Sequence, residues 1–497
     1  MKTAAFSKQD EKQAKKRGIA AMQMAAQMSR FKKGFPFVRL ISPCVVKKGI
    51  LQLNQEEQKK AAKLFLSVGA QKKVIKFVPA SGAASRMFHF LEDPKPEYDL
   101  LKQKFLSRLP DFAFYVGLTA ALRKTGQNIQ ELRKTKKIKP IVAALLEDNG
   151  LGYRRAPKGM ILFHRDGKQT RTAFEEQLSE GVIFKNKKNQ TWQHFTLPVQ
   201  ARKKVRSHLN QAAVKNKGKQ RIFLSDSIQS FATDCLAAER NGLPVRDENG
   251  ALLFRPAGHG ALLGNLNSLR ADLIYVKNID NILPRAHSKE ADQWKRILCG
   301  VFLEHQAQIF NVQKILKKNK MTPEEALIAI RLAQKLSGGE GRSREFQNRK
   351  SLERFFNRPL RVCGMVPNTG EPGGGPFWTK DSQNNISAQI VESAEVNFKS
   401  KEQERIWRSS THFNPVDFVC GVCDFRGKKY DLMKFADPER GLVTQKAYQG
   451  REIRVMELPG LWNGGMANWL SLFVEIPAKI FAPVKTALDL LRPEHQP

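Results

Sequence analysis

The sequence predicts a mixed α/β fold built around a mostly parallel sheet. Short β-prone runs alternate with helical stretches along most of the chain, and this alternation is typical of parallel sheets. Of the 497 residues 41% are hydrophobic, which is enough for a sizeable core and excludes a disordered or low-complexity chain. At roughly 100 to 200 residues per domain, the length allows about three domains or one elaborated catalytic domain.

Residues 1–69 are predicted to form an N-terminal helical segment. In its clearest part, LNQEEQKKAAKLFLSVG, Asn54 can cap a helix and Glu57 can bond back to the cap. Apolar residues such as Ala61 and Phe65 then recur at helical spacing, and Gly69 ends the helix.

Residues 70–299 are predicted to be the nucleotide-binding part of a catalytic domain. An apolar β run, Val74 to Val78, is followed by a small-residue turn and by a helical segment from Ser85. Further strands are expected at Met160–His164, His194–Val199, Arg221–Leu224 and Asp272–Val276.

The β signal vanishes in residues 300–358, which are predicted to be a helical insertion. Its best helix has Thr322 as the cap, Pro323 in the first turn, Glu325 completing a capping box and Gly338 at the end. Strands return in residues 359–497, the predicted sugar-binding part, at Arg361–Val366, up to Ser393 and up to Val422. The apolar segment from Trp469 is expected to be a helix or a pair of strands.

The formal net charge of +38 raises the question of nucleic acid as a partner. Basic runs such as Arg133–Lys139 and Arg202–Arg206 lack the interleaved aromatic residues of single-strand binders, so this partner is not favoured. No apolar run is long enough for a membrane span, and the N-terminus carries no signal-peptide pattern, which predicts a cytoplasmic protein. Six scattered cysteines exclude a disulfide scaffold, and Cys420 and Cys423 are interpreted as structural.

Two early motifs suit an anion. The turn Ala80, Ser81, Gly82 between a strand and a helix lets backbone N–H groups approach a phosphate, and Arg86 adds a full charge. Lys158, between Pro157 and Gly159, can also reach a phosphate. The alternatives are an ordinary structural joint for the turn and a solvated side chain for the lysine.

Later loops supply further candidates. Gly258 and Gly260 place His259 where it can face a ligand, although a structural histidine would look the same. Asp280 follows an apolar strand, where a carboxylate can hold Mg²⁺ beside phosphates. Glycines around Gly374 leave backbone exposed for a ligand, or form a plain loop. Asn414 precedes a strand, and Lys485 follows a proline-fixed turn.

The order of these motifs is similar to that of the UDP-sugar pyrophosphorylases, in the nucleotide-diphospho-sugar transferase (GT-A-like) superfamily. The chain also resembles a bacterial family of about this length described as a domain of unknown function, DUF4301. The resemblance covers most of the chain from about Lys73 onward. Its motifs are ASGAASRM from Ala80, the GHG of Gly258–Gly260, KNIDN from Lys277, FNPVD from Phe413 and FAPVKT from Phe481.

The resemblance implies a role for each candidate. Arg86, Lys158 and Lys485 would hold the reacting phosphates, and Asp280 would bind Mg²⁺ or the ribose-phosphate region. The other implied contacts are Ala80, Ser81, Gly82, Gln229, Gly258, His259 and Gly260 for the nucleotide, and Gly374, Glu392 and Asn414 for the sugar phosphate. The first loop departs from the family pattern, because Gly82 stands where several glycines are usual.

The resemblance therefore implies a Mg²⁺-dependent transfer of a nucleotidyl group, expected to be uridylyl, from a nucleoside triphosphate to a sugar-1-phosphate. Two alternatives stay open: a basic nucleic-acid-associated protein, and a relative that binds nucleotide or sugar phosphate without turnover. The sugar, the base and the oligomeric state are not fixed by the sequence.

Overall fold

A computed structural model describes residues 6–215, 218, 220–338, 346, 348–368, 370 and 373–497. The chain forms two compact units, each assembled from three stretches of sequence. Unit 1 comprises Met1–Leu64, Gln229–Leu273 and Leu298–Ile476. Unit 2 comprises Phe65–Ile228, Ile274–Ile297 and Pro477–Pro497.

The sheet of unit 2 is the parallel part that the sequence predicts. Its strand order is β11 (Leu273–Lys277), β4 (Val74–Pro79), β7 (Gln190–Leu197) and β8 (Arg221–Ile228), and β7 runs parallel to both β4 and β8. Five successive residues of β4 are buried, as expected for a parallel strand covered on both faces. The helices α9 (Ala173–Gly181) and α10 (Arg202–Lys215) pack against each other beside it.

The predicted strand at Met160–His164 is present with shifted bounds. Met160 lies in a short helical turn, and the strand β5 covers Leu162–Asp166 and forms a hairpin with β6 (Gln169–Thr172). The shift arises because Gly159 and Met160 belong to the turn that holds Lys158.

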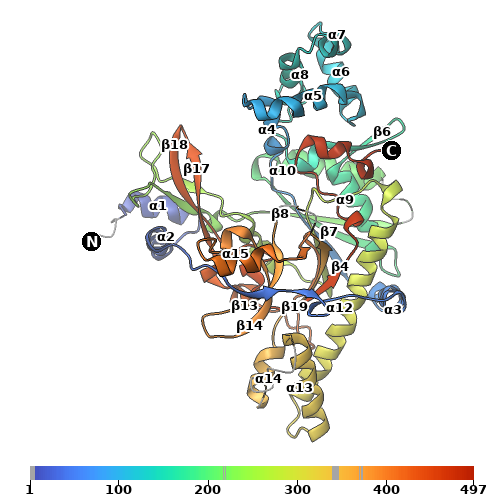
Figure 1. The fold of residues 1–497 in the computed structure, drawn as a ribbon, viewed down its shortest axis with the longest axis vertical. Coiled ribbons are helices and arrows are strands. Elements are labelled where there is room, and N and C mark those ends of the chain that lie inside the picture. Colours follow the sequence, from blue (N-terminus) through green and yellow to red (C-terminus); the bar gives the residue numbers. More distant parts are fainter. Residues whose placement is uncertain are drawn as a thin grey trace. The chain divides into compact units, whose positions relative to one another are not determined.

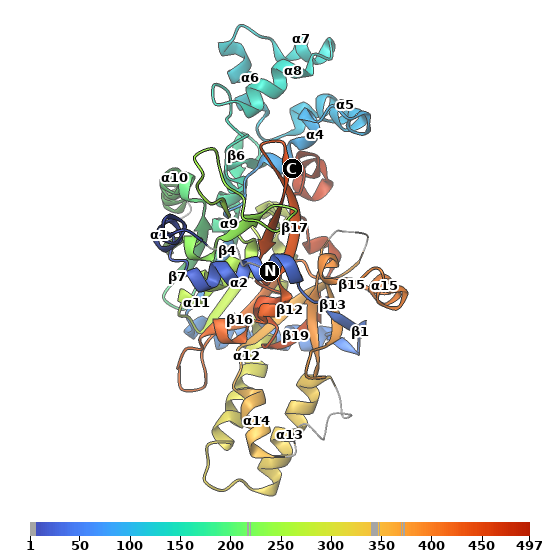
Figure 2. The same ribbon diagram turned by 90° about the vertical axis from the view of Figure 1, so that its left-hand side faces the viewer.

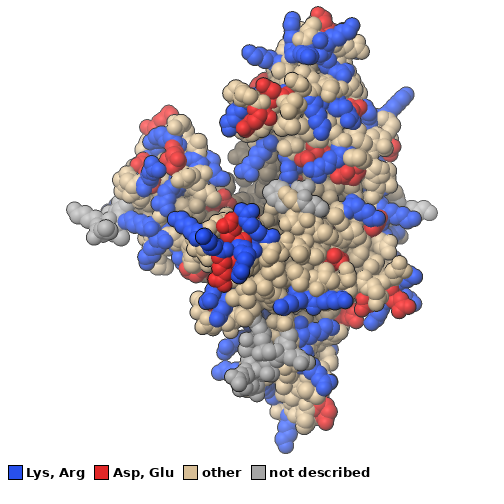
Figure 3. Space-filling model, in the orientation of Figure 1, with Lys and Arg blue, Asp and Glu red and all other residues tan. Residues whose placement is uncertain are grey.

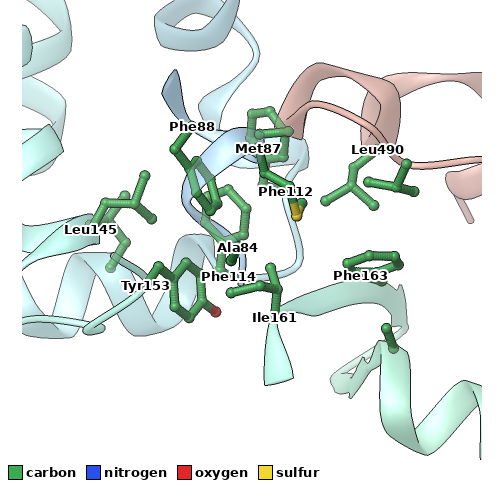
Figure 4. Packing of buried hydrophobic residues seen from close by; sticks show 14 of the residues in the cluster. Ala84, Met87, Phe88, Phe112, Phe114, Leu145, Tyr153, Ile161, Phe163 and Leu490 are labelled. Atoms are coloured by element: carbon green, nitrogen blue, oxygen red, sulfur yellow. The ribbon is translucent and has the colours of Figure 1, made fainter. Parts of the chain in front are cut away.

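Five helices follow the first strand of unit 2: α4 (His89–Glu92), α5 (Asp99–Ser107), α6 (Tyr115–Lys124), α7 (Ile129–Lys134) and α8 (Ile138–Leu146). They share one apolar cluster with the segment after β4. Figure 4 shows Ala84 and Met87 of that segment packed with Phe88, Phe114 and Leu490. Residues at the end of the 80–87 loop and directly after it are therefore anchored in this apolar cluster.

Unit 1 contains five further strands, and most of their pairings are parallel. Their order is β2 (Val45–Val46), β3 (Gly49–Leu51), β19 (Leu470–Glu475), β12 (Leu360–Pro367) and β16 (Asp417–Gly421). Only the β12–β16 pair among these is antiparallel, and the short strand β15 (His412–Phe413) also pairs with β12. The predicted mixed α/β class with a mostly parallel sheet is confirmed.

Two smaller sheets complete unit 1. One has the order β1 (Arg39–Pro43), β13 (Gly375–Lys380), β14 (Ile386–Val391), and the other β10 (Phe254–Arg255), β9 (Cys235–Ala238), β18 (Arg451–Glu457), β17 (Leu442–Tyr448). Helices α1 (Lys8–Lys16) and α2 (Ala21–Lys33) lie beside the second sheet (Figure 1), and Met24 and Phe31 pack on Leu236 and Met456.

The first 69 residues are not wholly helical. Helix α3 (Gln55–Ser67) begins as predicted, because Glu57 N donates to Asn54 Oδ1 at 2.9 Å and Asn54 N donates to Glu57 Oε2 at 2.8 Å. Strands β1, β2 and β3, however, lie between α2 and α3. They are only two to five residues long, and β1 and β3 pair with strands far along the chain, so local sequence gives little sign of them.

The insertion contains α12 (Lys289–Ile315), α13 (Pro323–Ser337) and α14 (Arg349–Phe356), and none of its described residues from 300 to 358 lies in a strand (Figure 2). Thr322 caps α13 with the predicted capping box, and Gly338 ends it in the left-handed conformation at φ 97°. Across the part of the chain that the structure describes, no helix is both long and apolar enough to cross a membrane.

Candidate active site

The loop after β4 presents backbone donors. Ala80 N is occupied by Thr196, and Ala84 N donates to Ala156 O at 3.0 Å. Within the described residues, the N–H groups of Ser81, Gly82 and Ala83 have no hydrogen-bond partner. A run of unpaired N–H groups attracts an anion, so the geometry suits the predicted phosphate-binding role.

The same loop positions Lys158. Residues 83 and 157 form an antiparallel bridge, in which Lys158 N donates to Gly82 O at 3.0 Å. Gly159 is required here, because a Cβ atom on it would lie 2.5 Å from Cε2 of Phe174. The close approach of Phe174 therefore fixes the turn from which the Lys158 side chain emerges.

Three predicted residues from distant parts of the chain meet in unit 2. Lys158 Nζ lies 2.7 Å from Asp280 Oδ2, and Lys485 Nζ lies 3.3 Å from the same oxygen. Asp280 and Lys158 are largely buried, whereas the Lys485 side chain is 50% exposed. Two ammonium groups thus share one carboxylate, which leaves one positive charge uncompensated within the three-residue cluster.

Backbone pairing brings Lys485 to Asp280. Asn281 and Pro483 form an antiparallel bridge, Val484 N donates to Asp280 O at 3.0 Å, and Ala482 N donates to Asn281 Oδ1 at 3.2 Å. Asp489 then accepts from the backbone N–H of Lys485 at 2.8 Å. The KNIDN and FAPVKT motifs therefore act as one paired structure.

Gln177, a buried residue of α9, forms hydrogen bonds with the backbone of the KNIDN segment just before Asp280. Its Nε2 donates to Asn278 O at 2.9 Å and to Ile279 O at 3.3 Å. An ordinary polar residue in a helix gives no sequence signal of such a role, so Gln177 was not predicted.

In the cluster of Lys158, Asp280 and Lys485, burial and the neighbouring charges shift the pKa values in opposite directions. Burial alone would raise the pKa of Asp280, but attraction to Lys158 and Lys485 outweighs it, and the pKa lies below its usual value. Burial lowers the pKa of Lys158, and Asp280 partly offsets that effect.

The structure does not join Arg86 to this cluster. Its side chain is exposed and forms none of the hydrogen bonds around Asp280. Arg86 lies in the short turn Ser85–Met87, directly after the unpaired N–H groups.

Asp280 is the one predicted metal ligand. Mg²⁺ is commonly held by one or two carboxylates together with substrate phosphates. One carboxylate fits an ion that arrives with a triphosphate, and does not fit an ion held by the protein alone. No group of three or more His, Cys, Asp or Glu among the described residues could hold a metal.

In unit 1 the GHG loop fixes the orientation of His259. Leu461 N donates to His259 Nδ1 at 3.1 Å, so the neutral ring carries its hydrogen on Nε2. Nε2 lies 3.8 Å from Glu392 Oε1, which is too far for a hydrogen bond. Burial lowers the pKa of His259 to about 4, although Glu457 and Glu395 act in the opposite direction.

Backbone conformation and close packing explain why this loop has glycine at positions 258 and 260. Gly258 has a φ of 74°, and a Cβ atom on Gly260 would lie 2.2 Å from Pro459 O. Gln229, by contrast, lies just after β8, and its Nε2 is buried without a hydrogen-bond partner among the described residues.

The predicted sugar-side residues also meet in unit 1. Asn414 N donates to Gly374 O at 2.8 Å, and a Cβ atom on Gly374 would lie 3.2 Å from Glu392 Cγ. Asn414 Nδ2 is buried and has no partner among the described residues. In the glycine-rich loop of Gly364–Trp378, residues 369, 371 and 372 lie outside the described part of the chain.

A buried ion pair that was not predicted from the sequence supports these residues. Arg440 Nε donates to Glu395 Oε1 at 2.9 Å, and Glu395 Oε2 accepts from Glu392 N at 2.9 Å and from Asn463 Nδ2 at 3.1 Å. Trp462, next to Asn463, stacks on His259 with the ring centroids 4.1 Å apart. The glycines of LPGLWNGGM are the one local signal that could have identified this loop.

Nearly the whole chain matches one known protein family. A family described as a domain of unknown function (DUF4301) matches residues 7–496. The chain belongs to the DUF4301 family. A search of curated proteins gives no match.

Solved structures similar to this DUF4301 protein include UDP-glucose phosphorylase from Trypanosoma brucei, with a TM-score of 0.47 and 12% identity over 97% of this chain and 77% of that one. A mutant of UDP-glucose pyrophosphorylase from Leishmania major has a TM-score of 0.43 and 12% identity over 98% of this chain and 79% of that one. At such low identity and TM-score, neither likeness decides what the DUF4301 protein binds or catalyses.

Proposed function

We propose that the protein is a nucleotidyltransferase that transfers a nucleotidyl group, expected to be uridylyl, from a nucleoside triphosphate to a sugar-1-phosphate. The observation that carries the proposal is the convergence of Lys158 and Lys485 on Asp280. The unpaired N–H groups of residues 81–83 supply further donors for phosphate oxygens.

The proposed reaction needs positioning and charge more than acid–base chemistry. An oxygen of the sugar-1-phosphate attacks the α-phosphorus, the bond from that phosphorus to the bridging oxygen breaks, and pyrophosphate leaves. Lys158 and Lys485 would hold the phosphates, and Arg86 would add charge from its exposed position. Mg²⁺ bound with the triphosphate would neutralise part of its charge, with Asp280 as its protein carboxylate.

In unit 1, Glu392 and Asn414 would contact the sugar, while the 258–260 loop and Gln229 would contact the nucleoside. Among the residues that the structure describes, the buried Asn414 Nδ2 has no hydrogen-bond partner, and His259 Nε2 lies beyond hydrogen-bond distance of Glu392. These roles rest on the motif resemblance.

The test combines turnover with binding. Purified protein is supplied with UTP, Mg²⁺ and a panel of sugar-1-phosphates, and pyrophosphate release is measured. Calorimetry then gives the affinity for UTP. We expect Lys485→Ala to weaken UTP binding by about tenfold or more, because a charge-assisted contact contributes about 1.5–3 kcal/mol.

Lys479→Ala is the matched control, because Lys479 is an exposed lysine of the same stretch that pairs with Glu290 at 2.7 Å. It should bind UTP as the unmodified protein does. Binding without turnover over the whole panel would favour a non-catalytic relative. Absence of both binding and turnover would refute the proposal.

A further inference from the structure

A cavity of about 280 Å³ lies in unit 1, and none of its lining residues belongs to the predicted site. Its walls come from the end of α12, from α14 and from the turn that follows β16. The volume is close to the lower end of the ~300–1,000 Å³ range of small-molecule pockets.

A buried glutamine joins all three walls. Gln313 of α12 donates through Nε2 to Phe356 O at 2.7 Å, and its Oε1 accepts from Phe425 N at 3.3 Å. A third bond runs from Nε2 to Tyr430 Oη at 3.2 Å. These hydrogen bonds hold the three walls of the cavity together within the protein itself.

The rim of the cavity is cationic, with Lys317, Lys350, Arg354 and Arg426. Both carboxylates at the rim form ion pairs. Asp424 Oδ2 lies 3.3 Å from Arg426 Nη2, and Glu353 Oε1 lies 3.5 Å from Lys317 Nζ. Lys350 and Arg354 form no ion pair within the described residues. The rim therefore holds two positive charges in excess.

Among the apolar residues that line the cavity, Phe425 is half-buried, whereas Leu316 and Phe356 are almost completely buried. A bare inorganic anion would leave the accessible part of the Phe425 ring in contact with water, and an uncharged ring would not use the rim. The surface is therefore complementary to a small molecule that joins a ring to a phosphate or carboxylate group.

We propose that this cavity binds a small organic anion, namely an aromatic or similarly planar ring that carries a phosphate group. The ring lies against Phe425, and Lys350 and Arg354 hold the phosphate.

The test uses three probes on the full chain: phenyl phosphate, inorganic phosphate and phenol. Calorimetry is expected to show phenyl phosphate bound about tenfold or more tightly than either fragment. Arg354→Ala should weaken phenyl phosphate binding about tenfold, and Phe425→Ala should make phenyl phosphate and inorganic phosphate equivalent.

Lys314→Ala is the matched control, because Lys314 is an exposed lysine of α12 outside the cavity, and it should bind like the unmodified protein. Lys485→Ala should also leave this binding unchanged, which separates the cavity from the proposed nucleotide site. Circular dichroism establishes that each variant is folded. Equal affinity for phenyl phosphate and inorganic phosphate in the unmodified protein, or unchanged binding in folded Arg354→Ala, would overturn the proposal.

Discussion

Gly82 and Gly159 lie within one local structure of unit 2 and meet different surroundings. A Cβ atom on Gly82 would meet nothing within 4 Å, whereas one on Gly159 would lie 2.5–2.7 Å from three ring atoms of Phe174. The fold therefore needs a glycine at position 159. At position 82 the absence of a side chain serves only to let a ligand approach the backbone N–H groups of the loop.

This contrast predicts different outcomes for two alanine variants. Gly159→Ala should lower the free energy of unfolding by about 1–3 kcal/mol, because the ring must move. Gly82→Ala should leave stability unchanged and weaken pyrophosphate binding, because a methyl group would crowd the unpaired N–H groups. Urea denaturation and calorimetry measure the two effects. Equal destabilisation by both substitutions would contradict this account.

Single residues also show the limits of sequence reasoning. Three residues could be selected from local pattern: Lys158 lies between Pro157 and Gly159, Asp280 follows an apolar strand, and Lys485 follows a proline-fixed turn. Gln177 and Asp489 could not, because their importance comes only from the backbone atoms that they meet.

Helix α9 links several elements of unit 2 through one buried carboxylate. Glu180 Oε1 lies 2.8 Å from Nζ of Lys76 in β4. Glu180 Oε2 lies 2.7 Å from Nζ of Lys277 in β11 and 3.0 Å from Nζ of Lys295 in α12. Burial by itself would raise the pKa of Glu180, but the three lysines lower it well below its usual value. Burial is also the main cause that lowers the pKa of Lys76 to about 8.

We expect Glu180→Gln to destabilise the protein by about 3–5 kcal/mol, because breaking a buried ion pair leaves ammonium charge poorly compensated. Glu97→Gln is the control: Glu97 is exposed, and its substitution should change stability by less than about 0.5 kcal/mol. Thermal and urea unfolding provide the comparison. A small effect of Glu180→Gln would show that the ammonium groups are otherwise compensated.

At the level of elements, helices with their own end signals were predictable. Thr322 and Asn54 mark the starts of α13 and α3 through contacts within four residues. Strands β1 and β17 were not predicted, because their stability depends on partners that only the tertiary fold supplies.

For the whole molecule, pH is expected to change stability through buried histidines. Burial lowers the pKa of His194 to about 4 and that of His495 to about 3, whereas an unfolded histidine titrates near its ordinary value of 6.5. Between pH 6.5 and about 4 the unfolded chain therefore binds more protons than the folded one. Stability should fall with decreasing pH, by about 1.4 kcal/mol per pH unit for each histidine.

Urea unfolding at pH 7.5, 6 and 5 measures this dependence. His194→Gln should reduce the slope by the contribution of one histidine, whereas His89→Gln should leave the slope unchanged, because the His89 side chain is 64% exposed. A pH-independent free energy of unfolding over this range would contradict the prediction.

The net charge of +38 is also a property of the whole molecule. On the face in Figure 3, lysines and arginines are spread over many elements with acidic residues among them. Such a distribution can raise the local concentration of anions, but it does not choose a partner.

Local sequence patterns were enough to predict the mixed α/β class, the ends of the capped helices and a short list of polar residues in loops. Each of these depends on contacts within a few residues, which local sequence encodes. The folded chain was needed to show that Lys158, Asp280 and Lys485 meet, that Glu395 and Arg440 pair next to Glu392, and that Gln313 joins the walls of a cavity. Those contacts join residues separated by tens to hundreds of positions, and only the folding of the whole chain brings them within bonding distance.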